Sequence, residues 1–318
     1  MSDDSIPWYV RWVIGSGAWV TAVVLMLLGG AFVFALLDLK DPGALIFVGA
    51  AYLAIGLALL NRDDAGVFTQ QLGVAAAAAG AGLFAGGFAA TFEELWIGLF
   101  AAIVTLLVVI FLSRDKTVQF LAAALVAVFY FATLLDGRTP YLVDFAAITT
   151  PVGLYLLLRP PRKDFMPTAV ALLCAFPVLS IGIMDGAFWM RNIVSGGTVA
   201  RILHIVLFLL LVYLHWQRSA DDGARIQTAV FAVVATLLCL LLPPGGSAAM
   251  LILMLAFVIG SKPFALLGAT LQVQFIARYY YSLQMNLFDK SMLLMAVGLL
   301  LMATWWFMHR SERRGERP

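Results

Sequence analysis

The chain has 318 residues, of which 63% are hydrophobic and only 12% are charged, and its formal net charge is +2. A soluble domain is about 25% charged, so this chain has too few polar side chains to cover a surface in water. The composition excludes a soluble globular domain, a disordered chain and a disulfide scaffold, and it predicts a multipass membrane protein.

Twelve apolar segments are long enough, or nearly so, to cross a membrane as helices, because the hydrocarbon core requires about 20 apolar residues per helix. Their hydrophobic runs do not alternate with polar residues, so they are not barrel strands. The predicted fold is therefore all-α, a polytopic transmembrane helix bundle forming one integral membrane domain over residues 1–318. The predicted spans are residues 14–37, 42–60, 65–90, 95–113, 117–135, 141–158, 165–184, 199–216, 226–242, 246–260, 264–281 and 291–308.

The number of crossings depends most on the tenth predicted span. Pro243 and Pro244 precede this short segment, and Lys262 and Pro263 follow it closely. Ten or eleven crossings therefore stay open beside twelve.

The third predicted span is rich in small residues. It has an alanine run over residues 75–79, and its glycines are Gly73, Gly80, Gly82, Gly86 and Gly87. Gly82 and Gly86 are four residues apart, a spacing that lets helix backbones approach closely in membranes. We expect this helix to be central in its bundle. Pro151, Pro167 and Pro177 fall within or near the sixth and seventh spans, where each is either a functional hinge or an ordinary tolerated kink.

Charge sets the expected orientation, because cytoplasmic loops carry an excess of Lys and Arg. With both termini in the cytoplasm, most of the 20 Lys and Arg residues fall on the inner side, including those of a basic cytoplasmic tail at residues 309–318. The first apolar run follows Asp3 and Asp4 and not a basic region, so it is predicted to be a retained span. The bacterial inner membrane is the simplest location.

Motifs for catalysis or cofactor binding are not evident. The sequence has no Walker loop, its three histidines are dispersed, and Cys174 and Cys239 fall inside predicted spans. Glu93 and Glu94 form an acidic pair on a short outer connection that could be interpreted as catalytic, but no outer domain accompanies it to hold an acceptor. We therefore expect no enzyme activity, no cofactor, no metal and no nucleic-acid partner.

Ionisable residues at membrane depth are a better guide to function than catalytic motifs. Placing such a side chain in the hydrocarbon core costs free energy unless it is paired or hydrated. Several of them map to the outer half of the bundle and suggest a polar cavity open to the periplasm. Alternatively, Asp144 pairs with Arg201 or Arg278 to hold the bundle together, and Lys290 snorkels to the interface. The candidate polar cluster contains Asp144, Arg201, His204, Arg278, Asp289 and Lys290.

The last two predicted spans contain a distinctive sequence motif. It is a Tyr-Tyr-Tyr-Ser-Leu run from Tyr279, followed by Asp289, Lys290 and Ser291. It resembles the C-terminal signature of a bacterial family catalogued as domain of unknown function 4401. The resemblance implies an inner-membrane protein whose gene often neighbours one for a membrane-anchored protein with a Gly-Asp-Tyr motif, and it implies no catalytic residue.

The tyrosine run itself has two interpretations. The rings either anchor the protein at the outer interface or form a surface on which the partner's outer segment docks. The candidate docking residues are Tyr279, Tyr280, Tyr281 and Ser282. Ser291 stands where it could cap the last helix.

Two classes of function follow. The first is an accessory or scaffold protein that acts with a membrane-anchored partner, favoured by short loops, absent motifs and the family resemblance. The second is a secondary transporter of a small solute or lipid, favoured by twelve spans, by the outer polar cluster and by a similar layout of residues 111–135 and 257–283 that would fit parallel repeats.

Overall fold

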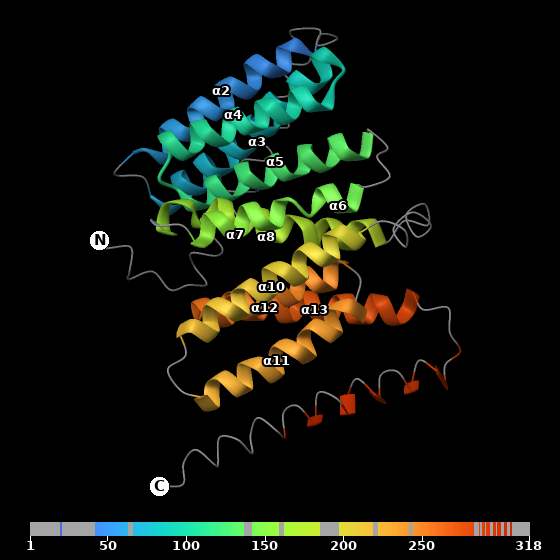
Figure 1. Ribbon diagram of the computed structural model, residues 1–318. Coiled ribbons are helices and arrows are strands. Elements are labelled where there is room, and N and C mark those ends of the chain that lie inside the picture. The colour runs from blue at the N-terminus through green and yellow to red at the C-terminus, as the bar shows by residue number, and fades with distance from the viewer. Residues whose placement is uncertain are drawn as a thin grey trace. The chain divides into compact units, whose positions relative to one another are not determined.

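The computed structural model describes residues 42–62, 66–136, 142–158, 162–184, 197–218, 222–241 and 244–282, with a few single or paired residues elsewhere (Figure 1). Within these ranges every regular element is a helix, which confirms the predicted all-α class for this part of the chain. The helices are α2 (Gly43–Leu60), α3 (Val67–Phe92), α4 (Leu95–Leu112), α5 (Lys116–Asp136), α6 (Leu142–Ala146), α7 (Thr149–Leu158), α8 (Arg162–Met184), α10 (Thr198–Arg218), α11 (Asp222–Leu241), α12 (Pro244–Ile259) and α13 (Lys262–Ser282).

Five helices in the described ranges are long and apolar enough to cross a membrane: α2, α3, α4, α5 and the Thr198–Gln217 part of α10. Shorter apolar helices cover Val143–Leu158, Phe165–Ser180, Thr228–Leu240 and Pro244–Ile259. Large apolar side chains such as Phe47, Phe111 and Leu266 are more than two-thirds exposed, as expected where the surroundings are lipid. These features suggest a membrane protein.

Two predicted spans at the chain ends cannot be compared in full. Residues 14–37, the first predicted span, lie outside the described residues apart from Val20, and residues 291–308 are described only in short helical pieces. The described helices form two compact units. The first contains Met1–Thr139 and Val152–Ala175, and the second contains Pro140–Pro151 and Phe176–Pro318.

In the first unit, α3 packs against α2, α4 and α5, so the expectation of a central third helix is confirmed within this unit. The close approach to α2 uses glycines spaced seven residues apart. A Cβ atom at Gly80 would overlap the backbone of Leu53, and one at Gly56 would overlap the backbone of Ala77. The backbones therefore touch directly, which gives helix packing in lipid much of its van der Waals contact.

The expected close approach is confirmed at Gly73, Gly80 and Gly87, whereas Gly82 and Gly86, the pair with the four-residue spacing, do not contact α2. Among the described residues, a Cβ atom at either position would meet nothing within 4 Å, whereas one at Gly73 or Gly87 would touch α2. The physical reason is the helix period, because residues seven apart return to nearly the same face, and Gly73, Gly80 and Gly87 keep that spacing.

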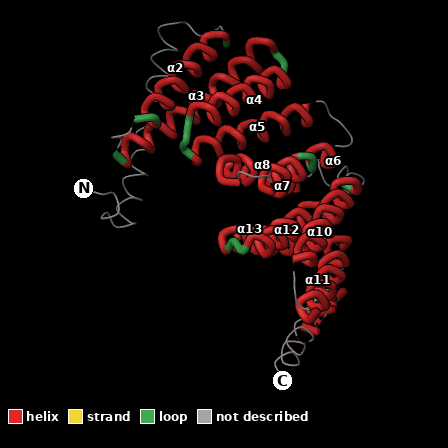
Figure 2. The backbone as a smooth tube through the Cα atoms, turned by 60° about the vertical axis from the view of Figure 1, so that its left-hand side comes forward, coloured by secondary structure: helices red, strands yellow, loops and turns green. Residues whose placement is uncertain are grey.

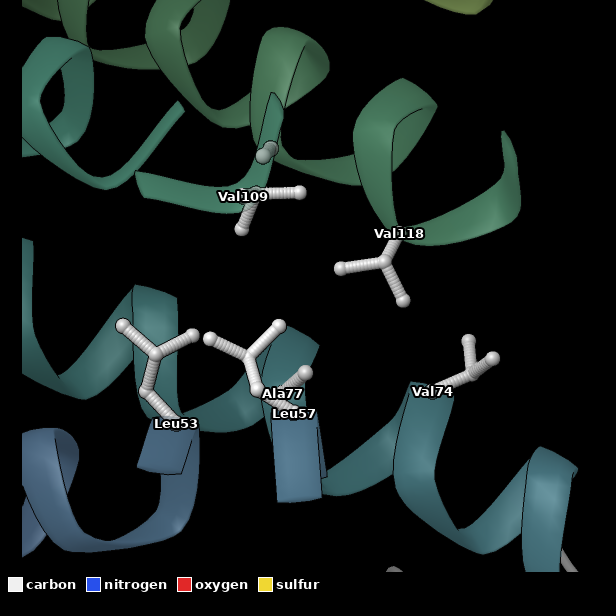
Figure 3. Packing of buried hydrophobic residues seen from close by; sticks show 7 residues of the cluster. Leu53, Leu57, Val74, Ala77, Val109 and Val118 are labelled. Atoms are coloured by element: carbon white, nitrogen blue, oxygen red, sulfur yellow. The ribbon is translucent and has the colours of Figure 1, made fainter. Parts of the chain in front are cut away.

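Four helices of the first unit share a small apolar core near their connected ends. Side chains from α2, α3, α4 and α5 point toward one another in Figure 3, and its labelled members are Leu53, Leu57, Val74, Ala77, Val109 and Val118. The Asn61 side chain at the end of α2 donates a 2.9 Å hydrogen bond to the Leu112 carbonyl at the end of α4. The C-terminal ends of α2 and α4 therefore lie at the same end of the unit.

The sixth predicted span is not one helix. It divides into α6 and α7, with a break at Ala147 and Ile148. Pro151 supplies the reason, since its missing N–H cannot bond to the Ala147 carbonyl. That carbonyl accepts instead from the N–H of Thr150, at 3.1 Å. The Thr149 hydroxyl donates to the Ala146 carbonyl, also at 3.1 Å.

In the second unit, α12 packs against α10, α11 and α13. Figure 2 shows these four elements as helices. All residues from Pro244 to Ile252 are buried, so α12 is enclosed on every side over its first half. Its opening residues are small, and this lets its neighbours come close around its N-terminal end.

Candidate functional site

Three helices of the second unit meet where α10 begins. Gly197, immediately before α10, has a φ of +93°, a left-handed conformation that favours glycine. A Cβ atom there would lie 2.8 Å from Pro244 Cγ of α12 and 3.1 Å from Val143 Cγ1 of α6. Space and backbone conformation both require glycine at this junction, which we call the α10 junction.

Asp144 caps α10 from outside the helix. Its carboxylate oxygen accepts a 2.8 Å hydrogen bond from the backbone N–H of Ala200, the third residue of α10. Gly197 has no side chain to perform this task, so α6 supplies the acceptor. A carboxylate at this position also interacts favourably with the partial positive charge of the helix N-terminus.

This capping role predicts different effects for two substitutions. We expect Asp144→Ala to lower the free energy of unfolding by about 0.5–2 kcal/mol, the usual value of an N-cap side chain. Asp144→Asn retains an acceptor oxygen, so it should lower the free energy of unfolding by much less, about a few tenths of a kcal/mol. Thermal unfolding of the purified variants in one detergent measures both, and equal losses for the two would contradict a capping role.

One helical turn further along α10, His204 is completely buried and hydrogen-bonded through both ring nitrogens. Its Nε2 lies 3.1 Å from the Thr150 hydroxyl of α7, and its Nδ1 lies 3.2 Å from the Ser247 hydroxyl of α12. The ring of Phe176 packs beside it, with centroids 4.8 Å apart. Thr150 and Ser247 are buried as well.

The direction of these hydrogen bonds follows from the single proton of Ser247. That hydroxyl donates to the Pro244 carbonyl at 2.7 Å, so toward His204 it can only accept. Nδ1 therefore carries the imidazole proton, and Nε2 accepts from the Thr150 hydroxyl. The result is one directed chain of hydrogen bonds, from Thr150 through His204 and Ser247 to Pro244, which we call the His204 network.

The His204 network ends on a backbone carbonyl. A carbonyl oxygen accepts but cannot pass a proton on, so the network is closed and every polar atom of the imidazole is satisfied within it. It lies six residues, or about 9 Å, into α10. The next inward-facing residues, Phe208 and Leu211, are apolar and fully buried. The arrangement is suited to holding α7, α10 and α12 together.

The other predicted cluster residues lie apart from this network. Arg201 follows Ala200 in α10 and donates from Nη1 to the Leu240 carbonyl near the end of α11, at 3.3 Å. Its Nε is buried and has no hydrogen-bond partner among the described residues. The structure thus brings Asp144, Arg201 and His204 to one junction, although the bonds described above join Asp144 and Arg201 to backbone groups and not to each other.

The remaining cluster residues belong to the C-terminal part of the chain. Arg278 is half-buried in the last turns of α13. Asp289 is exposed, and its backbone N–H donates to the Asn286 side chain at 2.8 Å. Asn286 stands three residues before this amide, the spacing of an N-cap side chain, and the capping suggested for Ser291 stays a prediction. Lys290 lies outside the described residues.

The candidate docking residues occupy the last turn of α13. The Tyr280 and Tyr281 rings meet edge to face, with centroids 5.5 Å apart. Tyr281 is 81% exposed, so most of its ring is free to contact lipid or protein. Tyr279 and Ser282 continue the same turn of backbone, and their side chains lie outside the described part.

Sequence reasoning missed Thr150 and Ser247. Both are short hydroxyl side chains in apolar helices, which are common in membrane proteins and carry little signal by themselves. A weak signal does exist, because each stands beside a backbone irregularity, Thr150 before Pro151 and Ser247 after a Pro-Pro-Gly-Gly run. Helix interruptions in membranes are places where polar side chains satisfy freed backbone groups.

Among the described residues, no three His, Cys, Asp or Glu side chains come together in a way that could hold a metal ion. A family model described as "Domain of unknown function (DUF4401)" matches residues 7–311. No curated protein and no solved structure matches the chain.

Proposed function

Because the chain belongs to the DUF4401 family, whose function is unknown, we propose a role from the chemistry of its own residues: an accessory or scaffold protein of the bacterial inner membrane that acts with a membrane-anchored partner. The bundle crosses the membrane twelve times, with both termini in the cytoplasm. As the family resemblance implies, the partner is a membrane-anchored protein with a Gly-Asp-Tyr motif, and it docks on the outer end of α13 at the tyrosine run.

Two contacts support the alternating direction of the helices. Asn61 and Leu112, which the topology puts on the inner side, are hydrogen-bonded to each other in the first unit. Asp144 and Ala200, which it puts on the outer side, are hydrogen-bonded in the second. Helices that alternate in direction bring such ends together, and the excess of Lys and Arg decides which side is cytoplasmic.

The observation that carries the accessory role is the exposed tyrosine end of α13, taken together with the internal satisfaction of the His204 network. The His204 network is satisfied internally and ends on a carbonyl, so it offers no group to a solute. Tyr281 is 81% exposed. Tyrosine is enriched at protein interfaces because its ring buries a large apolar area while the hydroxyl keeps a polar partner.

Photo-crosslinking in living cells tests this proposal. A photoreactive phenylalanine analogue at Tyr281 should give one discrete protein adduct that mass spectrometry identifies as a membrane-anchored protein. Leu266 provides the matched control, since it lies on the same helix, is 72% exposed and is about 22 Å away along the axis. Its replacement should label lipid only, and the same protein pattern from both positions would contradict docking at the tyrosines.

A transporter is the second candidate, and the break between α6 and α7 is the observation that favours it. Transporters commonly build their binding sites around discontinuous helices, and here Thr150 follows the break and contacts His204. A solute or lipid that remains bound to the purified protein and is lost from a Thr150→Val variant would favour transport. Purification of the wild-type protein without any such molecule would count against it.

A further inference from the structure

A buried aromatic ring joins α12 to α13 just below the tyrosine end. Phe275 of α13 is completely buried, and a Cβ atom at Gly245 would overlap the edge of its ring at Cε1 and Cζ. The same Cβ atom would lie 2.9 Å from the Cβ of Ser180 in α8. Phe275 therefore lies directly on the backbone of Gly245, with no side chain between them.

The position of Gly245 is in turn fixed by the His204 network. Gly245 stands between Pro244 and Ser247, and these two residues are held by the Ser247 hydroxyl bond to the Pro244 carbonyl and by the bond from His204. Phe275 is about one helical turn before Tyr279. An unbroken series of contacts thus leads from His204 to the last turn of α13.

We propose that His204 and Ser247 are positioning residues for partner binding: they fix the first turn of α12, on which Phe275 rests, and so set how the end of α13 presents Tyr280 and Tyr281. Neither residue can touch a partner, because both are fully buried. The inference rests on the proposed docking function for its biological meaning, but its geometric part can be tested without the partner.

Two variants test this inference: Gly245→Ala alone, and Gly245→Ala combined with Phe275→Leu. The added methyl group must displace Phe275, and the smaller Phe275→Leu side chain should make room for it. A cysteine at Tyr281 reports the position of the last turn through its rate of labelling by a membrane-impermeant maleimide. We expect Gly245→Ala to change this rate by about threefold or more and the Gly245→Ala/Phe275→Leu double variant to restore it, as for residues in direct contact.

The control is Gly82→Ala, which should leave the labelling rate unchanged, because in the described part of the chain nothing lies within 4 Å of a Cβ atom at Gly82. Ser247→Ala and His204→Gln should change the rate in the same direction as Gly245→Ala. An unchanged rate in Gly245→Ala, or a change that Phe275→Leu does not reverse, would overturn the inference.

Photo-crosslinking from Tyr281 then separates this inference from the docking proposal. If both hold, the yield of the partner adduct falls in Gly245→Ala and recovers in the double variant. If labelling responds as expected but the wild-type protein gives no adduct, the positioning of the turn stands and docking fails. If the adduct yield and the labelling rate are both indifferent to Gly245→Ala, docking stands and the positioning role fails.

Discussion

Replacement of Gly80 by leucine should destroy the packing of α2 on α3 and destabilise the protein by about 3 kcal/mol or more, at or beyond the upper end of ordinary overpacking. The reason is that the added side chain would overlap backbone atoms of α2. Already a Cβ atom at Gly80 would overlap the Leu53 backbone nitrogen and lie 2.8 Å from the Gly49 carbonyl oxygen. Backbone atoms cannot rotate aside as a side chain can, so the two helices must separate.

Gly82→Leu is the matched control for this prediction. It adds the same side chain to the same helix two residues away, where a Cβ atom would meet none of the described residues within 4 Å. Thermal unfolding of both variants in the same detergent, followed by size-exclusion chromatography, measures the difference. Gly82→Leu should behave like the wild-type protein, and equal loss of folded protein in both variants would refute the proposed α2–α3 contact.

His204→Leu should have the second largest effect, a loss of about 1–2 kcal/mol in the free energy of unfolding. Leucine fills much of the space but leaves the Thr150 hydroxyl buried without its acceptor and removes a donor from Ser247. A buried polar group without a partner costs about 1–3 kcal/mol, and hydrogen bonds between membrane helices are commonly worth somewhat less.

A double-mutant cycle with Thr150→Val distinguishes a lost hydrogen bond from lost packing. Valine removes the hydroxyl that bonds to Nε2 of His204 and keeps the side-chain shape. Because both partners are then apolar, Thr150→Val/His204→Leu should be less destabilised than the sum of the single variants. Strict additivity of the two losses would show that Thr150 and His204 do not interact as described.

Hydrophobic length was sufficient to predict most of the helices. For α2, α4 and α5 the predicted and observed ends agree within one residue. The agreement is poorer at α8 and α11, which begin at Arg162 and Asp222, before the apolar segments that predicted them. The physical reason is that hydropathy marks the part of a helix that lies in lipid, whereas backbone hydrogen bonding continues into the polar flanks.

Which residues touch could not be predicted in the same way. Gly82 and Gly86 have the familiar spacing, but Gly73, Gly80 and Gly87 make the contact because their faces happen to be turned toward α2. Rotation of a helix about its own axis depends on all its neighbours, and an all-apolar segment carries little periodic signal to reveal it.

The candidate site shows the same limit. Asp144, Arg201 and His204 could be recognised from the sequence, because an ionisable side chain in an apolar segment costs free energy unless it is paired or hydrated. The structure does bring them together at the α10 junction. Their actual partners are Ala200, Leu240, Thr150 and Ser247. Two of these are backbone groups, which every residue possesses, so no sequence pattern could have selected them.

Gentle-detergent purification of the tagged, full-length protein, with mass spectrometry of the proteins and lipids that accompany it, tests the central claim most directly. The account predicts a stoichiometric membrane-anchored companion that is reduced when the tyrosines at 280 and 281 are replaced by alanine in an otherwise stable protein. Isolation of the chain alone, with a reproducibly bound solute or lipid and no companion, would contradict the accessory role and favour transport.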